Sequence, residues 1–166
     1  VKQVIIPLAG LGTRMLPLTK ALPKELWPLG SKSILEHILD ECFNAGVKEV
    51  IFVISKNKNI IKDYFSKNKS LEKVIKNKPN ILKKLTYLNR ISKRIKFVYQ
   101  DKPRGLGHAV MCAEKYIKSK YFLLLLPDDI IMGKNCTKEL MKINKKKQSS
   151  VLALKQVSKK LTYLKI

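Results

Sequence analysis

The sequence predicts an α/β fold in which a mostly parallel sheet carries helices on both faces. Strand-sized apolar runs recur at residues 3–8, 49–54, 95–100, 121–126 and 150–155, and helical patterns fill the intervals between them. Such alternation is typical of parallel strands joined by crossover helices. With 166 residues and 45% hydrophobic content, the chain is long enough for one domain with its own core, which we expect to span residues 1–166.

The first predicted strand runs directly into a glycine loop. The apolar run at 4–8 is followed by Gly10-Leu11-Gly12-Thr13-Arg14, and Lys24 lies ten residues beyond Arg14. Backbone amides of such a loop can approach a phosphate chain, and the two cations match its charge. An ordinary turn from strand to helix would use the same glycines, so the loop alone leaves both interpretations open.

Two better-known phosphate loops do not fit this sequence. Position 15 is Met where a dinucleotide fingerprint has its third glycine, and the pattern GxxxxGK[ST] is absent. The sequence therefore disfavours both a Rossmann dehydrogenase and a P-loop NTPase.

The clearest predicted helix begins after Ser33. Ser33 and Glu36 fit a capping box, an apolar stripe follows, and Gly46 ends the helix. Residues 56–94 are rich in Lys and Asn, and their apolar spacing predicts two or more amphipathic surface helices broken near Pro79, with a flexible insertion as the alternative. The stripe lies at Ile34, Leu35, Ile38, Leu39, Cys42 and Phe43.

Composition limits the classes of function. The net charge of +23 raises the hypothesis of nucleic-acid binding, but lysine is scattered over every segment, as AT-biased codon usage would also produce. We therefore expect no specific nucleic-acid partner. No apolar run reaches the ~18 residues of a membrane span, so we expect no membrane partner and a cytoplasmic protein.

The three cysteines give no metal or disulfide pattern. Cys42, Cys112 and Cys136 are far apart, without CxxC spacing, and only two histidines accompany them. Cys42 and Cys112 lie in segments with helical apolar spacing, so we interpret both as small buried hydrophobic residues.

Polar and glycine-containing segments follow three of the predicted strands. They are the loop at 8–14, Gln100 with the segment 105–109, and the pair Asp128 and Asp129 after 121–126. Open α/β sheets bind ligands at the carboxyl ends of their strands. We therefore expect these segments to converge on one crevice.

Together these motifs resemble the bacterial UTP-glucose-1-phosphate uridylyltransferases of the sugar nucleotidyltransferase superfamily. The resemblance extends to about Leu154 and rests on four motifs in order. They are Ala9-Gly10-Leu11-Gly12-Thr13-Arg14, Leu16-Pro17-Leu18-Thr19-Lys20-Ala21-Leu22-Pro23-Lys24-Glu25, Gln100 with Gly105-Leu106-Gly107-His108-Ala109, and Leu126-Pro127-Asp128-Asp129. It implies a Rossmann-like sheet, the nucleotide-diphospho-sugar transferase fold.

The resemblance also implies a role for each matching position. Arg14 and Lys24 would be the catalytic cations, Lys24 stabilising the α-phosphate, and Asp128 would hold Mg²⁺. Gln100 would hydrogen-bond the uracil edge through its amide donor and acceptor, while His108 would have a structural or capping role. The nucleotide-binding set would comprise Leu8, Ala9, Gly10, Gly12, Thr13, Arg14, Lys24, Gln100 and Gly105.

The implied substrates are UTP and glucose 1-phosphate, the implied products UDP-glucose and pyrophosphate, and family members form homo-oligomers. Family members continue well beyond the length of this chain, so we expect the C-terminal part of the fold to be missing and residues 157–166 to form an atypical tail. Two alternatives stay open: a nucleotide-binding fragment without turnover, and a relative of the thymidylyltransferases. A basic nucleic-acid-associated protein is a third and weaker one.

Overall fold

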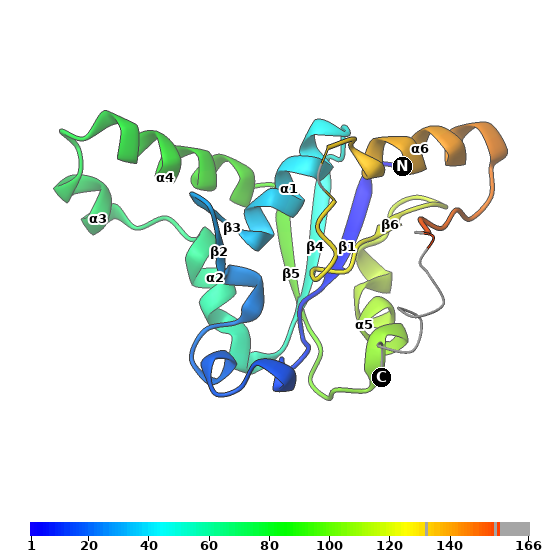
Figure 1. Cartoon of the computed structure of the whole chain (residues 1–166), viewed down its shortest axis with the longest axis horizontal. Coiled ribbons are helices and arrows are strands. Elements are labelled where there is room, and N and C mark those ends of the chain that lie inside the picture. The colour runs from blue at the N-terminus through cyan, green and yellow to red at the C-terminus, as the bar shows by residue number, and fades with distance from the viewer. Residues whose placement is uncertain (132, 155, 157–166) are drawn as a thin grey trace.

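Four parallel strands form the central sheet of the computed structural model, which describes residues 1–131, 133–154 and 156 (Figure 1). The strand order is β5-β4-β1-β6, and every pair of neighbours is parallel. The predicted α/β class is confirmed. The strands are β1 (Gln3–Pro7), β4 (Glu49–Ile54), β5 (Ile95–Tyr99) and β6 (Leu123–Leu124).

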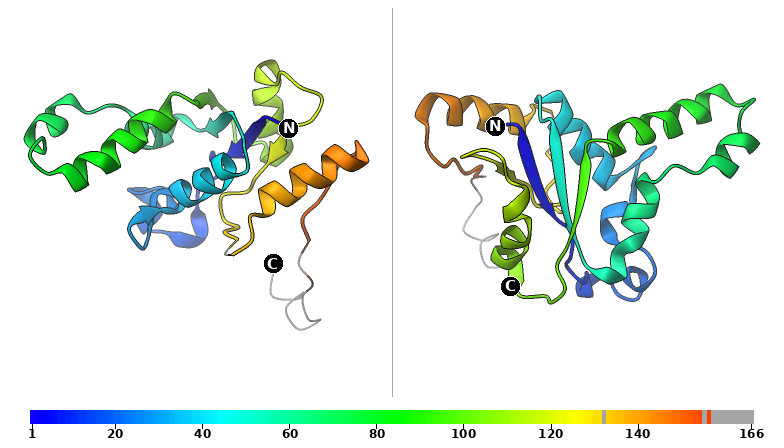
Figure 2. Two further views of the ribbon diagram at one scale, coloured as in Figure 1. Left: turned by 90° about the horizontal axis from the view of Figure 1, so that it is seen from above. Right: turned by 180° about the vertical axis from the view of Figure 1, so that it is seen from behind.

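Helices cover both faces of this sheet, as predicted. Alternate residues of β1 point to opposite faces, so Val4 and Ile6 join one buried cluster and Ile5 joins another. Helix α1 (Ile34–Asn44) packs into the first cluster and α5 (Gly105–Ala113) into the second. Figure 2 shows these two helices on opposite sides of the strands.

Helix α1 begins at the predicted capping box. The amide of Glu36 donates to Ser33 Oγ (3.2 Å), and the Ser33 amide donates to Glu36 Oε2 (2.8 Å). Such a cap stabilises a helix by about 1 kcal/mol. Gly46, with φ at +97°, follows the end of the helix in the left-handed conformation that favours glycine.

The Lys-rich segment forms three helices, which confirms the surface-helix interpretation. They are α2 (Asn59–Phe65), α3 (Lys69–Val74) and α4 (Pro79–Ser92), and Pro79 is the first residue of α4. In Figure 1, α3 and the start of α4 extend away from the sheet.

The remaining elements are short apart from α6 (Cys136–Lys147), which packs on α1. Strands β2 (Pro28–Leu29) and β3 (Lys32–Ser33) form an antiparallel pair. Single 3-10 turns are η1 (Thr13–Met15), η2 (Leu18–Lys20), η3 (Lys24–Leu26), η4 (Lys56–Lys58) and η5 (Glu114–Tyr116). Among the described helices, none is both long and apolar enough to cross a membrane.

Three sequence expectations need correction. Residues 150–154 form no strand, because they pair with none of the described strands, and Leu152 and Leu154 are 82% and 89% exposed. Strand β6 is shorter than the predicted run at 121–126. Cys42 is buried as expected, but Cys112 of α5 is only half-buried, packed against the outside of the second cluster. The expected tail at 157–166 lies outside the described residues.

Candidate functional site

The carboxyl ends of all four parallel strands meet at one edge of the sheet. The amide of Leu8 donates to the Val53 carbonyl (2.7 Å), and that of Gln100 donates to the Ile54 carbonyl (2.9 Å). On the other side of β1, the Leu125 amide donates to the Ile5 carbonyl (3.1 Å). The loops that follow the strands therefore begin side by side, which brings together the three segments that the sequence singled out.

A cavity of about 250 Å³ opens at this edge. Three loops line it, those that follow β1, β4 and β5, and its size is near the lower limit of about 300 Å³ for small-molecule sites. The lining residues are Ala9, Leu11, Ser55, Lys56, Asn57, Gln100, Asp101 and Pro103. Ala9 and Gln100 were predicted site residues, whereas the wall at 55–57 was not.

Gln100 is held by two hydrogen bonds from its amide nitrogen. Nε2 donates to the Gly105 carbonyl (3.1 Å) and to Nδ1 of His108 (2.9 Å), and the residue is 6% exposed. Both amide hydrogens are thus used within the protein, and Oε1 has no hydrogen bond to any described residue. The site can therefore offer an acceptor at Gln100 rather than the donor and acceptor expected from the sequence. The contact also gives His108 the structural role that the sequence favoured.

The glycine loop requires glycine at position 12. Gly12 has φ at +66°, and a Cβ there would lie 3.0 Å from Cγ2 of Thr19, whose hydroxyl donates to the Gly12 carbonyl (2.8 Å). Gly10 has no such restriction. Thr13 and Arg14 begin η1 and are exposed, with their side chains accessible to a ligand.

Leu8 and Ala9 are buried at the end of β1. Because the Leu8 amide already donates to Val53, this residue can offer a ligand its carbonyl but not its N–H. Gly105 begins α5 with φ at +85°, a conformation that favours glycine, and it does not line the cavity.

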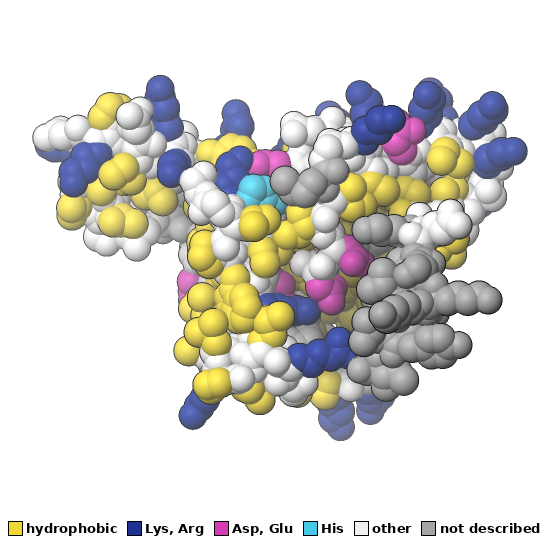
Figure 3. Space-filling view, in the orientation of Figure 1, with side chains coloured by type: hydrophobic (Ala, Val, Ile, Leu, Met, Phe, Trp, Pro, Cys, Tyr) yellow, Lys and Arg dark blue, Asp and Glu magenta, His cyan; other side chains and the backbone are white. Residues whose placement is uncertain are grey.

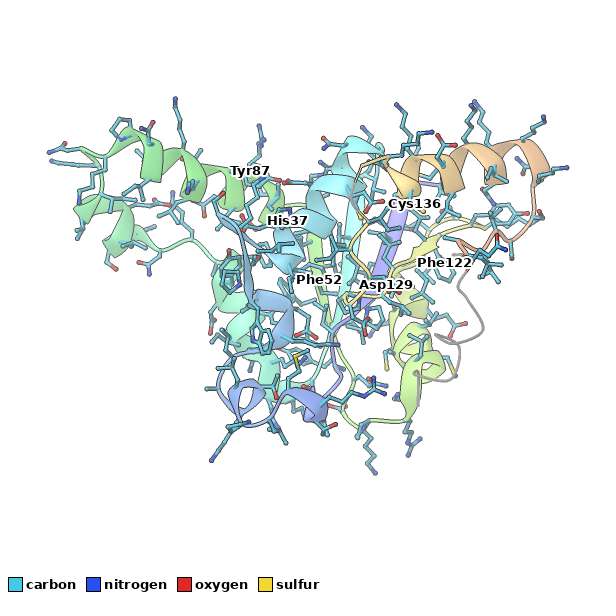
Figure 4. The ribbon with its side chains drawn as sticks, in the orientation of Figure 1. His37, Phe52, Tyr87, Phe122, Asp129 and Cys136 are labelled. Atoms are coloured by element: carbon cyan, nitrogen blue, oxygen red, sulfur yellow. The ribbon has the colours of Figure 1, made fainter. Side chains whose placement is uncertain are left out.

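Lys24 and Asp128 form an ion pair between the connection after β1 and the loop after β6. Lys24 Nζ lies 3.4 Å from Asp128 Oδ2, with side chains 27% and 63% exposed. Figure 3 shows basic and acidic side chains next to each other near the middle of this face, and Figure 4 places Asp129 in the loop after β6. An exposed ion pair of this kind stabilises a fold by about 1 kcal/mol at most. Both side chains are partly exposed and are therefore accessible to a charged ligand.

The donor chemistry at Asp128 fits Mg²⁺ only with help from a ligand. Carboxylate oxygens suit this ion, which keeps several waters and is bound by one or two carboxylates together with substrate phosphates. The part of the chain that the structure describes holds no cluster of three or more His, Cys, Asp or Glu side chains able to hold a metal. Asp128 and its neighbour Asp129 are therefore compatible with a site that a phosphate chain completes.

Sequence reasoning missed a buried ion pair beside this centre. Lys58 Nζ lies 2.9 and 3.0 Å from the two carboxylate oxygens of Glu25, with side chains 10% and 1% exposed. Lysine is so common in this chain that Lys58 resembled any solvated surface lysine. The only signal was its position, four residues after the end of a buried strand.

Open α/β sheets bind ligands at the carboxyl ends of their strands, which is where this chain has its glycine loop and its cavity. The family model described as Nucleotidyl transferase matches residues 3–163, and the chain belongs to this family.

Within it, the chain is similar to UTP--glucose-1-phosphate uridylyltransferases. It is 38% identical to that of Bacillus subtilis strain 168, with 98% of this chain and 56% of the relative covered, and 38% identical to that of Staphylococcus haemolyticus, with 98% and 57% covered. The chain spans little more than half the length of these curated relatives.

The chain is also similar to solved structures. The chain resembles UDP-glucose pyrophosphorylase complexed with UDP-glucose (TM-score 0.79, 30% identity, 95% of this chain and 58% of that one). It also resembles the UTP-bound enzyme from Acinetobacter baumannii (TM-score 0.82, 31% identity, 90% and 54%). The predicted Rossmann-like fold and the family resemblance are both confirmed.

Proposed function

We propose that this chain binds UTP and serves the reaction of UTP-glucose-1-phosphate uridylyltransferases, which forms UDP-glucose and pyrophosphate from UTP and glucose 1-phosphate. The main support is the cavity between the loops after β1, β4 and β5, with Lys24 and Asp128 at the same edge of the sheet. The relatives that carry this activity by name add to it.

The base is bound at Gln100. Its free Oε1 accepts a hydrogen bond from the N3–H of uracil, while the two donated bonds to Gly105 and His108 hold the amide in place. Cytosine has an unprotonated N3 and would place an acceptor against this acceptor. Ala9 and Gly10 offer backbone groups to the nucleoside, and Leu8 offers its carbonyl.

The triphosphate follows the glycine loop. Gly12 and Thr13 present backbone at the start of η1, and the exposed guanidinium of Arg14 supplies a planar set of donors for phosphate oxygens. Lys24 contacts the α-phosphate and stabilises the negative charge that develops there.

In the reaction, a phosphate oxygen of glucose 1-phosphate attacks the α-phosphorus of UTP. The bond from the α-phosphorus to the bridging oxygen breaks, and pyrophosphate leaves with the electron pair. The protein forms no covalent bond, so positioning and electrostatic stabilisation by Arg14 and Lys24 supply the acceleration. Asp128 would hold Mg²⁺, which when bound neutralises phosphate charge.

The test combines two assays on the 166-residue chain. Isothermal titration with UTP and Mg²⁺ measures binding, and pyrophosphate release with glucose 1-phosphate measures turnover. Binding with release supports the full proposal, and binding without release limits the function to nucleotide binding. Absence of binding would overturn both. Titration with dTTP separates the thymidylyltransferase alternative, which predicts tighter binding of dTTP than of UTP.

A further inference from the structure

The buried pair Glu25–Lys58 links the two loops that flank the candidate site. Glu25 belongs to η3, in the segment after β1, and Lys58 to η4, directly after β4. One ammonium contacts both oxygens of one carboxylate, at 2.9 and 3.0 Å, in a place from which water is almost excluded. Among the described residues, each side chain has no other hydrogen-bond or ion-pair partner.

Stability alone does not account for such a pair. Removing two charges from water is costly, and apolar residues of similar volume in the same place are often as stabilising or more so. The apolar surroundings are available here, because Leu26 of η3 and Ile61 of α2, which directly follows η4, lie in the main core cluster. A buried ion pair differs from such packing in that it fixes the relative position of two specific atoms.

The groups that the pair would position lie next to it in the sequence. Lys24 precedes Glu25 in a single 3-10 turn, closed by hydrogen bonds from Leu26 to Pro23 (2.9 Å) and from Trp27 to Lys24 (3.1 Å). Glu25 is 1% exposed while Lys24 is 27% exposed and reaches Asp128, so neighbouring side chains of this turn point to the core and to the site. A shift of Glu25 would therefore move Lys24.

The other end of the pair supports the cavity wall. Lys56 and Asn57 line the cavity and immediately precede Lys58, whose amide closes the turn by donating to Ser55 (3.0 Å). Fixing Lys58 to Glu25 thus sets the distance between the Lys24 ammonium and the cavity at Ala9 and Gln100, which we call the nucleoside cavity because the proposed function places the nucleoside of UTP there. This distance matters because a UTP molecule would have to contact both.

We propose that Glu25 and Lys58 are positioning residues that hold Lys24 at the correct distance from the nucleoside cavity. The inference rests on the proposed function, since it needs UTP to occupy the site. It gives no contact with substrate to either member of the pair.

A double-mutant cycle tests the pair through Lys24. The variants are the apolar pair Glu25→Leu/Lys58→Met, Lys24→Ala, and the combination of all three, each titrated with UTP and Mg²⁺. We expect the apolar pair to weaken UTP binding at least fivefold at an unfolding temperature near that of the parent. In the Lys24→Ala background the same change should weaken UTP binding less than twofold, because the ammonium that the pair positions is then absent.

A control comes from a second, more exposed ion pair. Lys118 Nζ lies 2.9 Å from Glu49 Oε2 at the beginning of β4, the opposite edge of the sheet from the site. Glu49→Gln/Lys118→Met should change UTP affinity less than twofold. Lys58→Arg, which keeps the cation, should retain UTP affinity within about threefold and serves if the apolar variant does not fold.

The outcomes separate the two proposals. If the parent binds UTP and the losses from the apolar pair and from Lys24→Ala multiply, the pair acts on the fold generally and the positioning role is wrong. If the apolar pair does not fold, the same conclusion follows when Lys58→Arg weakens UTP binding equally in the parent and in the Lys24→Ala background. If the folded parent binds no UTP, the proposed function fails and the positioning role fails with it.

Discussion

Lys24 Nζ lies 3.4 Å from Asp128 Oδ2, although the two residues are 104 positions apart in the sequence. Lys24 reaches this point from the long connection after β1, and Asp128 from the loop after β6, the neighbour of β1 in the sheet. The neighbouring strands β1 and β6 thus bring the segments of Lys24 and Asp128 to the same edge of the sheet, and the turn η3 carries the Lys24 side chain.

Replacing Lys24 by Ala should weaken UTP binding without abolishing it. A charge-assisted contact contributes about 1.5–3 kcal/mol, which corresponds to a loss of tenfold or more in affinity. Where the parent releases pyrophosphate, the variant should release none above background. Isothermal titration and the release assay measure the two effects, and full activity of Lys24→Ala would exclude its assigned role.

Asp128→Asn should remove the benefit of Mg²⁺ for UTP binding. The amide keeps the size of the side chain but loses the charge that attracts a divalent cation. UTP titrations with Mg²⁺ and with EDTA should differ strongly for the parent and little for the variant. Asp129→Asn is the matched comparison, and an equal loss in both variants would argue against a specific role for Asp128.

Gln100→Leu should reduce discrimination between UTP and CTP. The variant loses Oε1, the acceptor that would favour the N3–H of uracil over the bare N3 of cytosine. Competition titrations should give the parent a clear preference for UTP and the variant similar affinities for both. Selection between UTP and dTTP should persist unchanged, because thymine carries the same N3–H; a change in that ratio would contradict the proposed contact.

Gly12→Ala should destabilise the protein more than Gly10→Ala. A non-glycine residue at φ +66° costs about 1–2 kcal/mol, and the new Cβ would also lie 3.0 Å from Thr19 Cγ2. At Gly10 a Cβ meets no atom within 4 Å. Urea unfolding of the two variants gives the comparison, and equal midpoints would mean that the loop does not hold this conformation in solution.

Lys58→Met alone should lower the free energy of unfolding by about 3–5 kcal/mol, because it leaves the Glu25 carboxylate buried and unpaired. Adding Glu25→Leu should recover most of this loss. Chemical denaturation measures both. A mild single variant with no recovery in the double variant would show that water reaches Glu25.

Local patterns were sufficient to predict much of the fold. The capping box at Ser33 fixed the start of α1, and the apolar runs fixed the three long strands. The prediction of a strand at 150–155 was wrong because the composition of this run suits a strand, whereas residues 150–154 pair with no strand in the described part of the chain. Strand propensity describes a residue's suitability for a sheet, whereas a strand also needs a neighbour.

Residues of the candidate site could be predicted only where they belong to a recognisable sequence motif. The apolar run at 95–100 predicted that Gln100 ends a strand, and the family resemblance added its expected role toward uracil. The use of both its amide hydrogens by Gly105 and His108 depends on the turn into α5. The pair of Glu25 and Lys58 joins residues 33 positions apart, and no local spacing signals it. Contacts of this kind require the three-dimensional arrangement of the strands.

Titration of the folded 166-residue chain with UTP in the presence of Mg²⁺, with CTP as the comparison, decides whether this edge of the sheet binds a uridine nucleotide. We expect saturable binding of one UTP per chain, clearly tighter than that of CTP and weakened by Lys24→Ala. Equal binding of both nucleotides, or no binding by a chain that circular dichroism shows to be folded, would contradict a uridine nucleotide site at this edge of the sheet.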